Sequence, residues 1–270
     1  MSTCPAPVPS VIAALHLPPF PASSHPDAKT FSGIRDFALR NIHMALSAGI
    51  GAIALQDLGE HPVARPIPAH IIAGVAVVGA WIREEFPDLT LGVSLLGHGG
   101  REPLAIAQAI GAQFVRIKVY VGAMVKAEGL LEGCAAEAIS YRSQIGAGEI
   151  CIFADVHDRT GHPLGSLPLI EEFRQAAVFG CADGVVLTGS SFSETLEMIE
   201  EVRHGKFTTP ILIGGGVNPE NVAQALKVAG GVIVSSAFKE QSAFTRESMR
   251  ADWDHKRIAA FMQAVNEAKL

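Results

Sequence analysis

Clusters of basic residues are missing from this chain of 270 residues. Lys and Arg together number 21 against 27 Asp and Glu, which gives a formal net charge of −6 at pH 7. A protein that wraps nucleic acid needs a basic surface to neutralise the phosphates, so the composition excludes nucleic acid as a partner. Charged residues make up 18% of the chain and hydrophobic ones 49%, which excludes a disordered protein and predicts a large apolar core.

Long hydrophobic runs and closely spaced cysteines are missing as well. The longest charge-free apolar stretch, residues 66–82, is shorter than the ~20 residues that a bilayer span needs, so we expect a buried helix there. The N-terminus has no basic region before an apolar run, and we expect no signal peptide. The cysteines at positions 4, 134, 151 and 181 are too far apart for a metal knuckle and are typical of buried thiols in a reducing compartment. We therefore expect a cytoplasmic protein without a transmembrane segment.

The chain contains a regular alternation of short β-branched runs with longer helical patterns. Strands are predicted at residues 11–17, 51–56, 90–96, 114–119, 149–156, 183–188, 210–216 and 231–236. Helices are predicted at about residues 33–47, 66–86, 102–110, 130–144, 167–179, 194–204, 219–228 and 251–268.

This alternation predicts an α/β fold. Continuous apolar strands indicate burial on both faces, as in parallel sheets. Eight such units predict a single (β/α)8 TIM barrel over residues 1–270, with a flexible N-terminal stretch at 1–10 and a C-terminal helical segment at 241–270. A doubly wound sheet is the alternative, because a count of strands does not prove that the sheet closes.

Two loops that end neighbouring predicted strands carry small residues suited to phosphate binding. They comprise Gly214, Gly215, Gly216, Val217, Asn218, Ser235 and Ser236. Glycines let backbone N–H groups approach an anion, and barrels frequently bind phosphate with the loops after their last two strands. The alternative is that the glycines only form a tight turn and that Asn218 caps the following helix.

The fourth predicted strand carries two cations on one face. Arg116 and Lys118 are two residues apart, and in a strand such residues point the same way. A buried cation needs a partner, which would be a carboxylate such as Asp155 or an anionic substrate. As a third alternative, a lysine with a lowered pKa at a barrel mouth forms a Schiff base.

The fifth predicted strand ends in a carboxylate and an imidazole. Asp155 and His157 share one face by the same spacing, and this pair suits proton transfer near pH 7. With Asp57 or His16 the two could also hold a divalent metal, although their spacing matches no recognised metal motif and we predict no cofactor. The alternative for His157 is a loop residue that caps a turn.

Several stretches of the sequence resemble the BtpA/SgcQ family. They are RIKVYVG through HDRTGHPL at 116–164, ALHLPPFP at 14–21, the Gly-Val-Asn turn at 216–218 and GVIVSSAFK at 231–239. The likeness spans roughly residues 10 to 240 and implies a TIM barrel. The family is named after a photosystem I biogenesis factor and after a protein encoded with sugar-metabolism genes, so the resemblance implies no particular reaction.

The sequence departs from the family pattern where the barrel mouth is expected. Gln56-Asp57 replaces Glu-Asn, Ser94 replaces Asn, Lys118 replaces Asn, and Thr188-Gly189 replaces Ser-Gly. These changes suggest a divergent subgroup with a different ligand.

Our leading hypothesis is an enzyme for a small anionic, phosphorylated, sugar-like metabolite, with isomerase, epimerase or aldolase-type lyase chemistry that begins by proton transfer. Asp155 or Asp57 would be the base and His157 the proton shuttle. Lys118 or Arg116 would stabilise the oxyanion. The alternative is a non-catalytic assembly or regulatory scaffold. We also expect a homo-oligomer, because the mean hydropathy is +0.30.

Overall fold

Eight parallel strands form a closed barrel in this computed structural model, which describes residues 7–21, 23, 27–165, 167–240, 245 and 251–268. They are β1 (Val11–His16), β2 (Ala52–Gln56), β3 (Thr90–Ser94), β4 (Phe114–Ile117), β7 (Cys151–Val156), β9 (Gly184–Leu187), β10 (Ile211–Ile213) and β11 (Gly231–Val234). Their order around the barrel is β1-β11-β10-β9-β7-β4-β3-β2. Residues 11–13 of the first strand pair in parallel with residues 232–234 of the last. The predicted closed barrel is therefore confirmed, and the doubly wound sheet is excluded.

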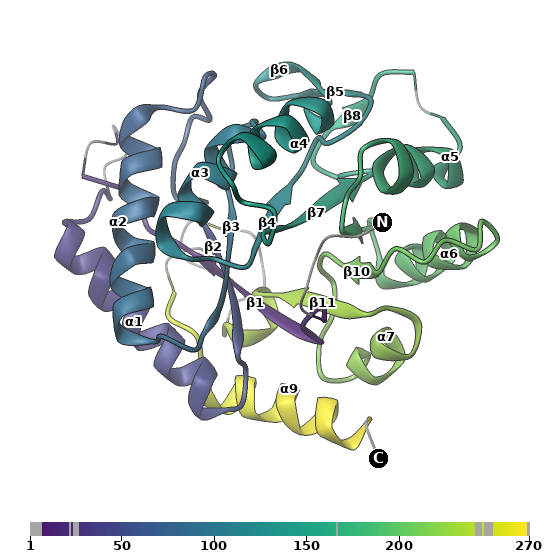
Figure 1. Cartoon of the computed structure of the whole chain (residues 1–270). Helices are drawn as coiled ribbons and strands as arrows, with labels where there is room; N and C mark the ends of the chain where they lie inside the picture. Colours follow the sequence, from purple (N-terminus) through teal and green to yellow (C-terminus); the bar gives the residue numbers. More distant parts are fainter. Residues whose placement is uncertain are drawn as a thin grey trace.

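Helices surround the strands (Figure 1). They are α1 (Phe31–Ser47), α2 (Ala69–Glu85), α3 (Arg101–Ile110), α4 (Ala135–Gln144), α5 (Leu169–Arg174), the π-helix η1 (Gln175–Phe179), α6 (Phe192–Arg203), α7 (Val222–Val228), the 3-10 helix η2 (Ser236–Phe238) and α9 (His255–Glu267). Side-chain caps fix three of the starts: Thr30 before α1, Ser191 before α6 and Asp254 before α9 each accept a hydrogen bond from a backbone N–H of the first turn. Throughout the described ranges, none of the helices combines the length and apolarity that crossing a bilayer requires.

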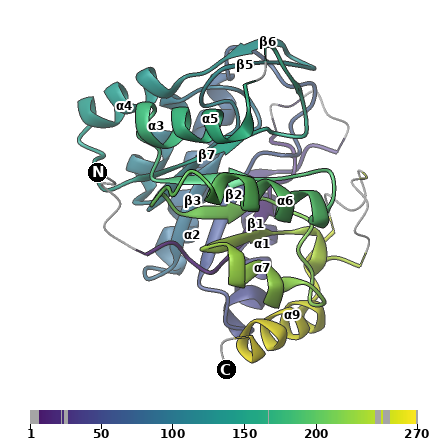
Figure 2. The same ribbon diagram turned by 90° about the vertical axis from the view of Figure 1, so that its right-hand side faces the viewer.

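A hairpin in the loop after β4 was not predicted. Strands β5 (Ala123–Lys126) and β6 (Gly129–Glu132) pair antiparallel, and β8 (His162–Pro163) pairs with β5 from the other side. The predicted helix at 130–144 is therefore wrong over its first residues: Gly129 has a φ of 97°, which closes the hairpin, and α4 begins only at Ala135. The hairpin and α9 lie at opposite edges of the molecule in both views (Figures 1 and 2).

The barrel interior is a separate apolar core from the one between strands and helices. It is built by Ile12, Ala14, Ala52, Ala54, Phe114, Cys151, Phe153, Val186, Leu212 and Ile233. The rings of Phe114 and Phe153 lie 5.1 Å apart and fill the centre of this core. Gly92 makes room for them, since a Cβ on that residue would lie 2.1 Å from the Phe114 ring. The interior is therefore a packed core and not a channel.

The cysteines differ from the expectation of four buried thiols. Cys134 is buried and free, Cys181 is free but exposed, and Cys151 is disulfide-bonded. The expectation is therefore wrong for Cys151 and for the burial of Cys181. Cys4 and most of the N-terminal stretch predicted as flexible lie outside the described residues, as does part of the predicted C-terminal segment.

Candidate active site

Strand alternation places a polar layer directly above the apolar core of the barrel. Side chains of a strand point inward at every second residue, so the inward position that follows each core residue lies at the carboxyl end of its strand. These positions are occupied by His16, Gln56, Ser94, Arg116, Asp155, Thr188, Gly214 and Ser235. The carboxyl ends of the strands are where barrels of this kind place their active sites. The chain therefore changes from apolar to polar at the mouth of the barrel.

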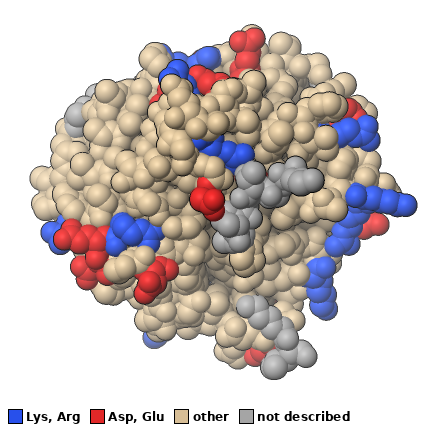
Figure 3. Space-filling model, in the orientation of Figure 1, with Lys and Arg blue, Asp and Glu red and all other residues tan. Residues whose placement is uncertain are grey.

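A cavity of about 360 Å³ opens at this mouth. Its charged lining consists of Arg116, Lys118, Lys126, Glu128, Asp158 and Arg159. The neutral part of the lining includes Gly214–Gly216, Ser235 and Ser236. This volume is in the range of small-molecule sites, and four cations against two carboxylates give the lining an excess of positive charge. On the face shown in Figure 3, acidic and basic side chains form mixed groups on the left and at the top, and basic side chains predominate along the right edge.

Arg116 and Asp155 form a buried ion pair beneath the cavity. Arg116 Nη2 lies 3.0 Å from Asp155 Oδ1, and Arg116 Nε lies 3.2 and 3.1 Å from the two carboxylate oxygens. Burial raises the pKa of the Asp155 carboxyl, and the Arg116 charge opposes that shift. Of the interpretations open for Arg116, the structure shows the ion pair with Asp155. Both oxygens of Asp155 are thereby directed to the guanidinium.

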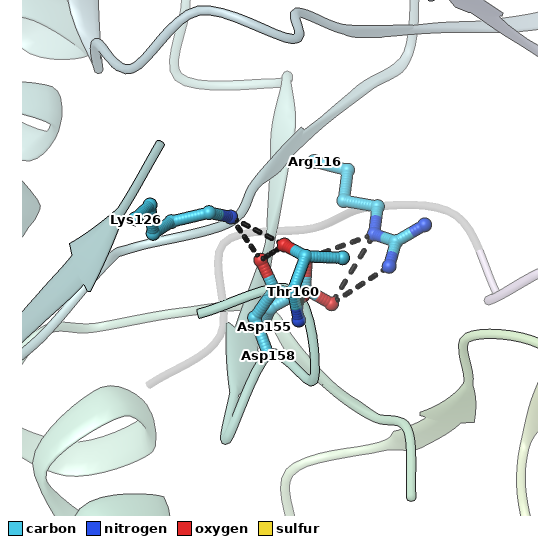
Figure 4. A network of polar contacts seen from close by, with 5 residues as sticks. All are labelled: Arg116, Lys126, Asp155, Asp158 and Thr160. Atoms are coloured by element: carbon cyan, nitrogen blue, oxygen red, sulfur yellow. Dashed lines mark hydrogen bonds and ion pairs between the residues drawn. The ribbon is translucent and has the colours of Figure 1, made fainter. Parts of the chain in front are cut away.

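A second ion pair ties the hairpin to the loop after β7. Lys126 Nζ lies 2.5 Å from both Asp158 Oδ2 and Thr160 Oγ1. Burial alone would raise the pKa of the Asp158 carboxyl, but the hydrogen bond and charge of Lys126 outweigh it and lower that pKa. Asp155 and Asp158 lie between the two cations Arg116 and Lys126 (Figure 4). The hairpin tip is thus fastened beside the cavity.

Lys118 has no such partner. Across the described part of the chain, its ammonium group makes neither a hydrogen bond nor an ion pair. Burial and the charges of Lys126 and Arg116 lower the pKa of Lys118 to about 8. Burial and neighbouring cations also lower the pKa of His16 to about 3, so that this imidazole is neutral at pH 7. The cavity therefore offers a neutral imidazole and a lysine that readily loses its proton.

Asp57 and His157 do not line this cavity. Asp57 borders a neighbouring pocket, where Oδ1 accepts a hydrogen bond of 2.5 Å from the Leu96 N–H, and burial raises its pKa to about 6. His157 has a φ of 56°, so the strand alternation ends at Val156 and the imidazole does not follow Asp155 into the mouth. Its Nε2 lies 2.8 Å from Glu172 Oε2, and this contact raises the pKa of His157.

Three of the five predicted catalytic residues meet at the mouth cavity, and His157 lines a second pocket together with Lys118 and Asp155. Arg116 and Lys118 line the cavity, and Asp155 lies beneath it on Arg116. Among the described residues, no group of three or more His, Cys, Asp or Glu side chains is arranged to hold a metal ion. The metal set considered for Asp155, His157, Asp57 and His16 is accordingly not assembled.

The glycine loop, residues 214–218, contains backbone N–H groups that are free to bind a ligand. The Gly214 N–H donates to Leu187 O, whereas those of Gly215, Gly216 and Val217 have no acceptor within the described ranges. Asn218 braces the loop: its Oδ1 accepts from the N–H groups of Glu220 and Asn221 at 3.1 Å each. The predicted alternative, in which Asn218 caps the following helix, is wrong in its position: the N-cap of α7 is Asn221, and Asn218 braces the turn before it.

Unpaired hydroxyls and one further cation complete this side of the mouth. Thr188 Oγ1 and Ser235 Oγ are buried without a hydrogen-bond partner among the described residues. Arg159 Nη2 would lie 3.6 Å from a Cβ on Gly215, which places its guanidinium over the glycine loop. Arg159 and Lys126 were not predicted as site residues, because Lys126 ends strand β5 of the unpredicted hairpin and Arg159 lies in the loop after β7, to which that hairpin is tied. No spacing signal marks either residue.

Comparisons with known proteins agree with the fold. A model described as the BtpA family matches residues 8–267. A mitochondrial protein of Caenorhabditis elegans is 31% identical over 97% of this chain and 94% of its own length. The photosystem I biogenesis protein BtpA of Synechocystis sp. is 28% identical over 95% of this chain and 88% of its own length.

Similar solved structures are also barrels of this size. A structure described as native KDPGal has a TM-score of 0.57 at 16% identity and covers 96% of this chain and 95% of its own. A phosphoribosyl anthranilate isomerase from Thermus thermophilus has a TM-score of 0.52 at 13% identity, covering 96% of this chain and 98% of its own. At these identities the likeness shows the fold alone.

Proposed function

This chain belongs to the BtpA family, and we propose that it is an enzyme acting on a small phosphorylated, sugar-like metabolite. The proposed chemistry is isomerisation, epimerisation or aldol-type cleavage, which all begin by proton transfer next to a carbonyl group. The observation that carries this proposal is the mouth cavity of about 360 Å³, whose lining has an excess of positive charge in an otherwise acidic chain. Such a cavity attracts and holds a small anion.

The phosphate end of the substrate would lie at the glycine loop. The backbone N–H groups of Gly215–Val217 have no acceptor among the described residues, and Arg159, Ser235 and Ser236 line the same cavity as Gly215 and Gly216. Backbone N–H groups and arginine are the usual phosphate ligands of proteins. In this proposal Asn218 acts through its turn-bracing hydrogen bonds and not by contact with the phosphate.

The reacting end would lie at Lys118 and Arg116. A lysine with a pKa of about 8 suits proton transfer near neutral pH. Arg116 would stabilise the developing oxyanion, and Asp155 would fix its orientation. The role predicted for Asp155 as a base thus becomes a positioning role in this proposal, and His157 takes no part because it faces Glu172.

Ribose 5-phosphate and ribose provide a direct test by titration calorimetry. We expect the phosphorylated sugar to bind and ribose not to bind, because only the phosphate meets the glycine loop. Arg159→Met should weaken binding by roughly 10- to 100-fold, the scale of a charge-assisted hydrogen bond. Arg203→Met is the matched control, since this arginine ends α6 and does not line the mouth cavity. Equal binding of both sugars, or unchanged affinity in Arg159→Met, would overturn the proposal.

A second candidate function, a non-catalytic scaffold, is favoured by one surface groove. The groove has a volume of about 600 Å³ and lies between α4 and η1, where Phe179 is 75% exposed. Apolar surface of this kind is typical of binding sites for other proteins. Sedimentation analysis of the wild type against Phe179→Ser would show whether this face holds the proposed homo-oligomer together.

A further inference from the structure

We infer that Lys118 is a nucleophile that forms a Schiff base with the carbonyl group of the substrate, an inference that rests on the function proposed above. It goes beyond proton transfer, because it makes the lysine a covalent participant. Four observations support it: Lys118 lines the cavity, it lies across the mouth from the Ser235 loop, the neighbouring cations are paired with carboxylates, and its pKa is lowered.

Lys118 directly follows the last residue of β4 and lines the cavity. Phe114 belongs to the apolar interior core, and Arg116 and Lys118 follow it at intervals of two residues. Lys118 also lines a second pocket beside the mouth cavity. Its amine can therefore meet a carbonyl carbon that enters from solvent.

Barrel topology places Lys118 opposite the Ser235 loop, whereas the glycine loop follows β10, which two strands separate from β4 on the shorter side. In the closed order, three strands separate β4 from β11 in either direction around the barrel. Lys118 follows β4, whereas Ser235 follows β11. A substrate whose phosphate is bound at the loops after β10 and β11 would therefore extend its other end across the mouth, towards the lysine.

The neighbouring cations are occupied by carboxylates, and Lys118 is not. Arg116 forms an ion pair with Asp155, and Lys126 forms one with Asp158 and a hydrogen bond to Thr160. A cation without a partner is costly to bury and loses its proton more easily. Burial, Lys126 and Arg116 lower the pKa of Lys118 to about 8, and the carboxylates Asp158 and Asp57 oppose this only in part. A larger fraction of Lys118 than of an ordinary lysine is thus the neutral amine, which is the nucleophilic form.

The covalent step balances without any further reactant. The lone pair of Nζ forms a bond to the carbonyl carbon while the C=O π bond breaks, and one amine proton moves to the oxygen to give a carbinolamine. A second proton, donated by a solvent water that becomes hydroxide, lets that oxygen leave as water, and the C=N bond forms with a positive nitrogen. This cationic nitrogen withdraws electrons from the adjacent C–H or C–C bond, and hydrolysis later restores the amine.

Reductive trapping tests the inference. The folded wild-type protein is incubated at pH 8 with glycolaldehyde phosphate and sodium cyanoborohydride, and the modified lysines are located by peptide mass mapping. We expect Lys118 to be modified at least about tenfold faster than any other lysine, since an ordinary lysine is almost fully protonated at this pH. Lys118→Arg should abolish that fast modification, and its thermal melt checks that the variant is folded.

Lys239 is the internal control, because burial lowers its pKa to about 8 as well but it does not line the mouth cavity. Fast modification at Lys239, or modification spread evenly over the lysines, would overturn the inference. Two further reactions distinguish a failure of this inference from a failure of the proposed function. One adds inorganic phosphate as a competitor, and the other replaces the aldehyde by unphosphorylated glycolaldehyde. Fast labelling of Lys118 by both aldehydes, without protection by phosphate, would support the Schiff base and overturn the phosphorylated substrate.

Discussion

Two buried Arg–Asp pairs lie at opposite ends of the barrel and differ in what surrounds them. Arg142 Nη1 lies 2.6 Å from Asp183 Oδ2, and the same arginine donates to Ile150 O while the same carboxylate oxygen accepts from the Ile152 N–H. These residues precede β7 and β9, at the amino ends of the strands. The pair of Arg116 with Asp155, in contrast, borders an open cavity at the carboxyl ends.

The two ends of the barrel differ in how many of their buried polar groups have hydrogen-bond partners. At the amino ends both partners are fixed by the backbone as well as by each other, so the pair ties α4 to the barrel. At the mouth an amine and buried hydroxyls lack partners within the described residues, and Asp57 carries a raised pKa. Barrels commonly use one end for stability and the other for catalysis, at some expense of stability. Substitutions at the two ends can test that division.

Asp183→Asn should have the largest effect. It leaves the guanidinium of Arg142 buried without its counter-charge, and we expect the free energy of unfolding to fall by about 3–5 kcal/mol in urea titrations. Asp155→Asn is the matched comparison at the mouth. Because Arg116 borders the cavity, water can solvate it, and we expect a loss of only about 1–2 kcal/mol.

For ribose 5-phosphate binding we expect the opposite order, with the larger effect in Asp155→Asn. Asp155→Asn frees Arg116 to move and should weaken binding by roughly 10- to 100-fold, the scale of a charge-assisted hydrogen bond, whereas Asp183→Asn, where still folded, should bind as the wild type does. A larger loss of stability in Asp155→Asn than in Asp183→Asn would mean that the mouth pair is the structural one.

Asp57→Asn should stabilise the protein at neutral pH. The folded pKa of about 6 lies above the ordinary value of 3.8, so the folded state holds its proton more tightly than the unfolded state. Stability is therefore greatest below pH 4 and falls as the pH rises towards 6, by roughly 3 kcal/mol. Asparagine does not titrate, so the variant does not lose stability in this way. Its free energy of unfolding should exceed that of the wild type above pH 7 and equal it near pH 4. Thermal melts from pH 4 to 8 measure this; a difference between the two proteins that stays constant with pH would mean that titration of Asp57 is not its cause.

Gly214→Ala should destabilise the mouth by about 1–3 kcal/mol, because overpacking forces neighbours to move. The new Cβ would lie 2.1 Å from Thr188 Oγ1 and 2.7 Å from Val186 Cγ1. Gly215→Ala is the control, since its Cβ meets only Arg159 Nη2 at 3.6 Å and Thr188 Cγ2 at 3.9 Å. We expect it to leave the stability within about 0.5 kcal/mol of wild type. Similar losses in both variants would show that the glycine run is needed for its turn and not for space.

Thr188→Val should have the smallest effect. It removes a buried hydroxyl that has no partner among the described residues, and we expect a gain of about 1 kcal/mol in the free energy of unfolding. The same change at Thr195, whose Oγ1 accepts from the Gly189 N–H and donates to Ser191 O, should destabilise the protein instead. A loss of stability in Thr188→Val would mean that its hydroxyl is already well satisfied.

The barrel could be predicted from sequence because its signals are local. Each strand is a short apolar run, and each helix has its own spacing and often its own cap, as at Thr30 and Ser191. The β5–β6 hairpin could not be predicted, because its run GLLEG is short and apolar enough to fit the start of a helix. Only pairing with β5 makes it a strand.

The residues of the candidate site also fall into those that local spacing predicts and those that depend on tertiary contacts. Arg116 and Lys118 were found because an interval of two residues fixes one face of a strand wherever that strand lies. The same rule failed for Asp155 and His157, since a backbone φ of 56° turns His157 towards Glu172. The sequence by itself therefore determined the strands, their inward faces and the polar layer above the core, which depend on local periodicity. Only the tertiary structure decided that Arg116 takes Asp155, that Lys118 stays without a partner and that Arg159 reaches the glycine loop, because those outcomes depend on which loops and charges meet across the mouth.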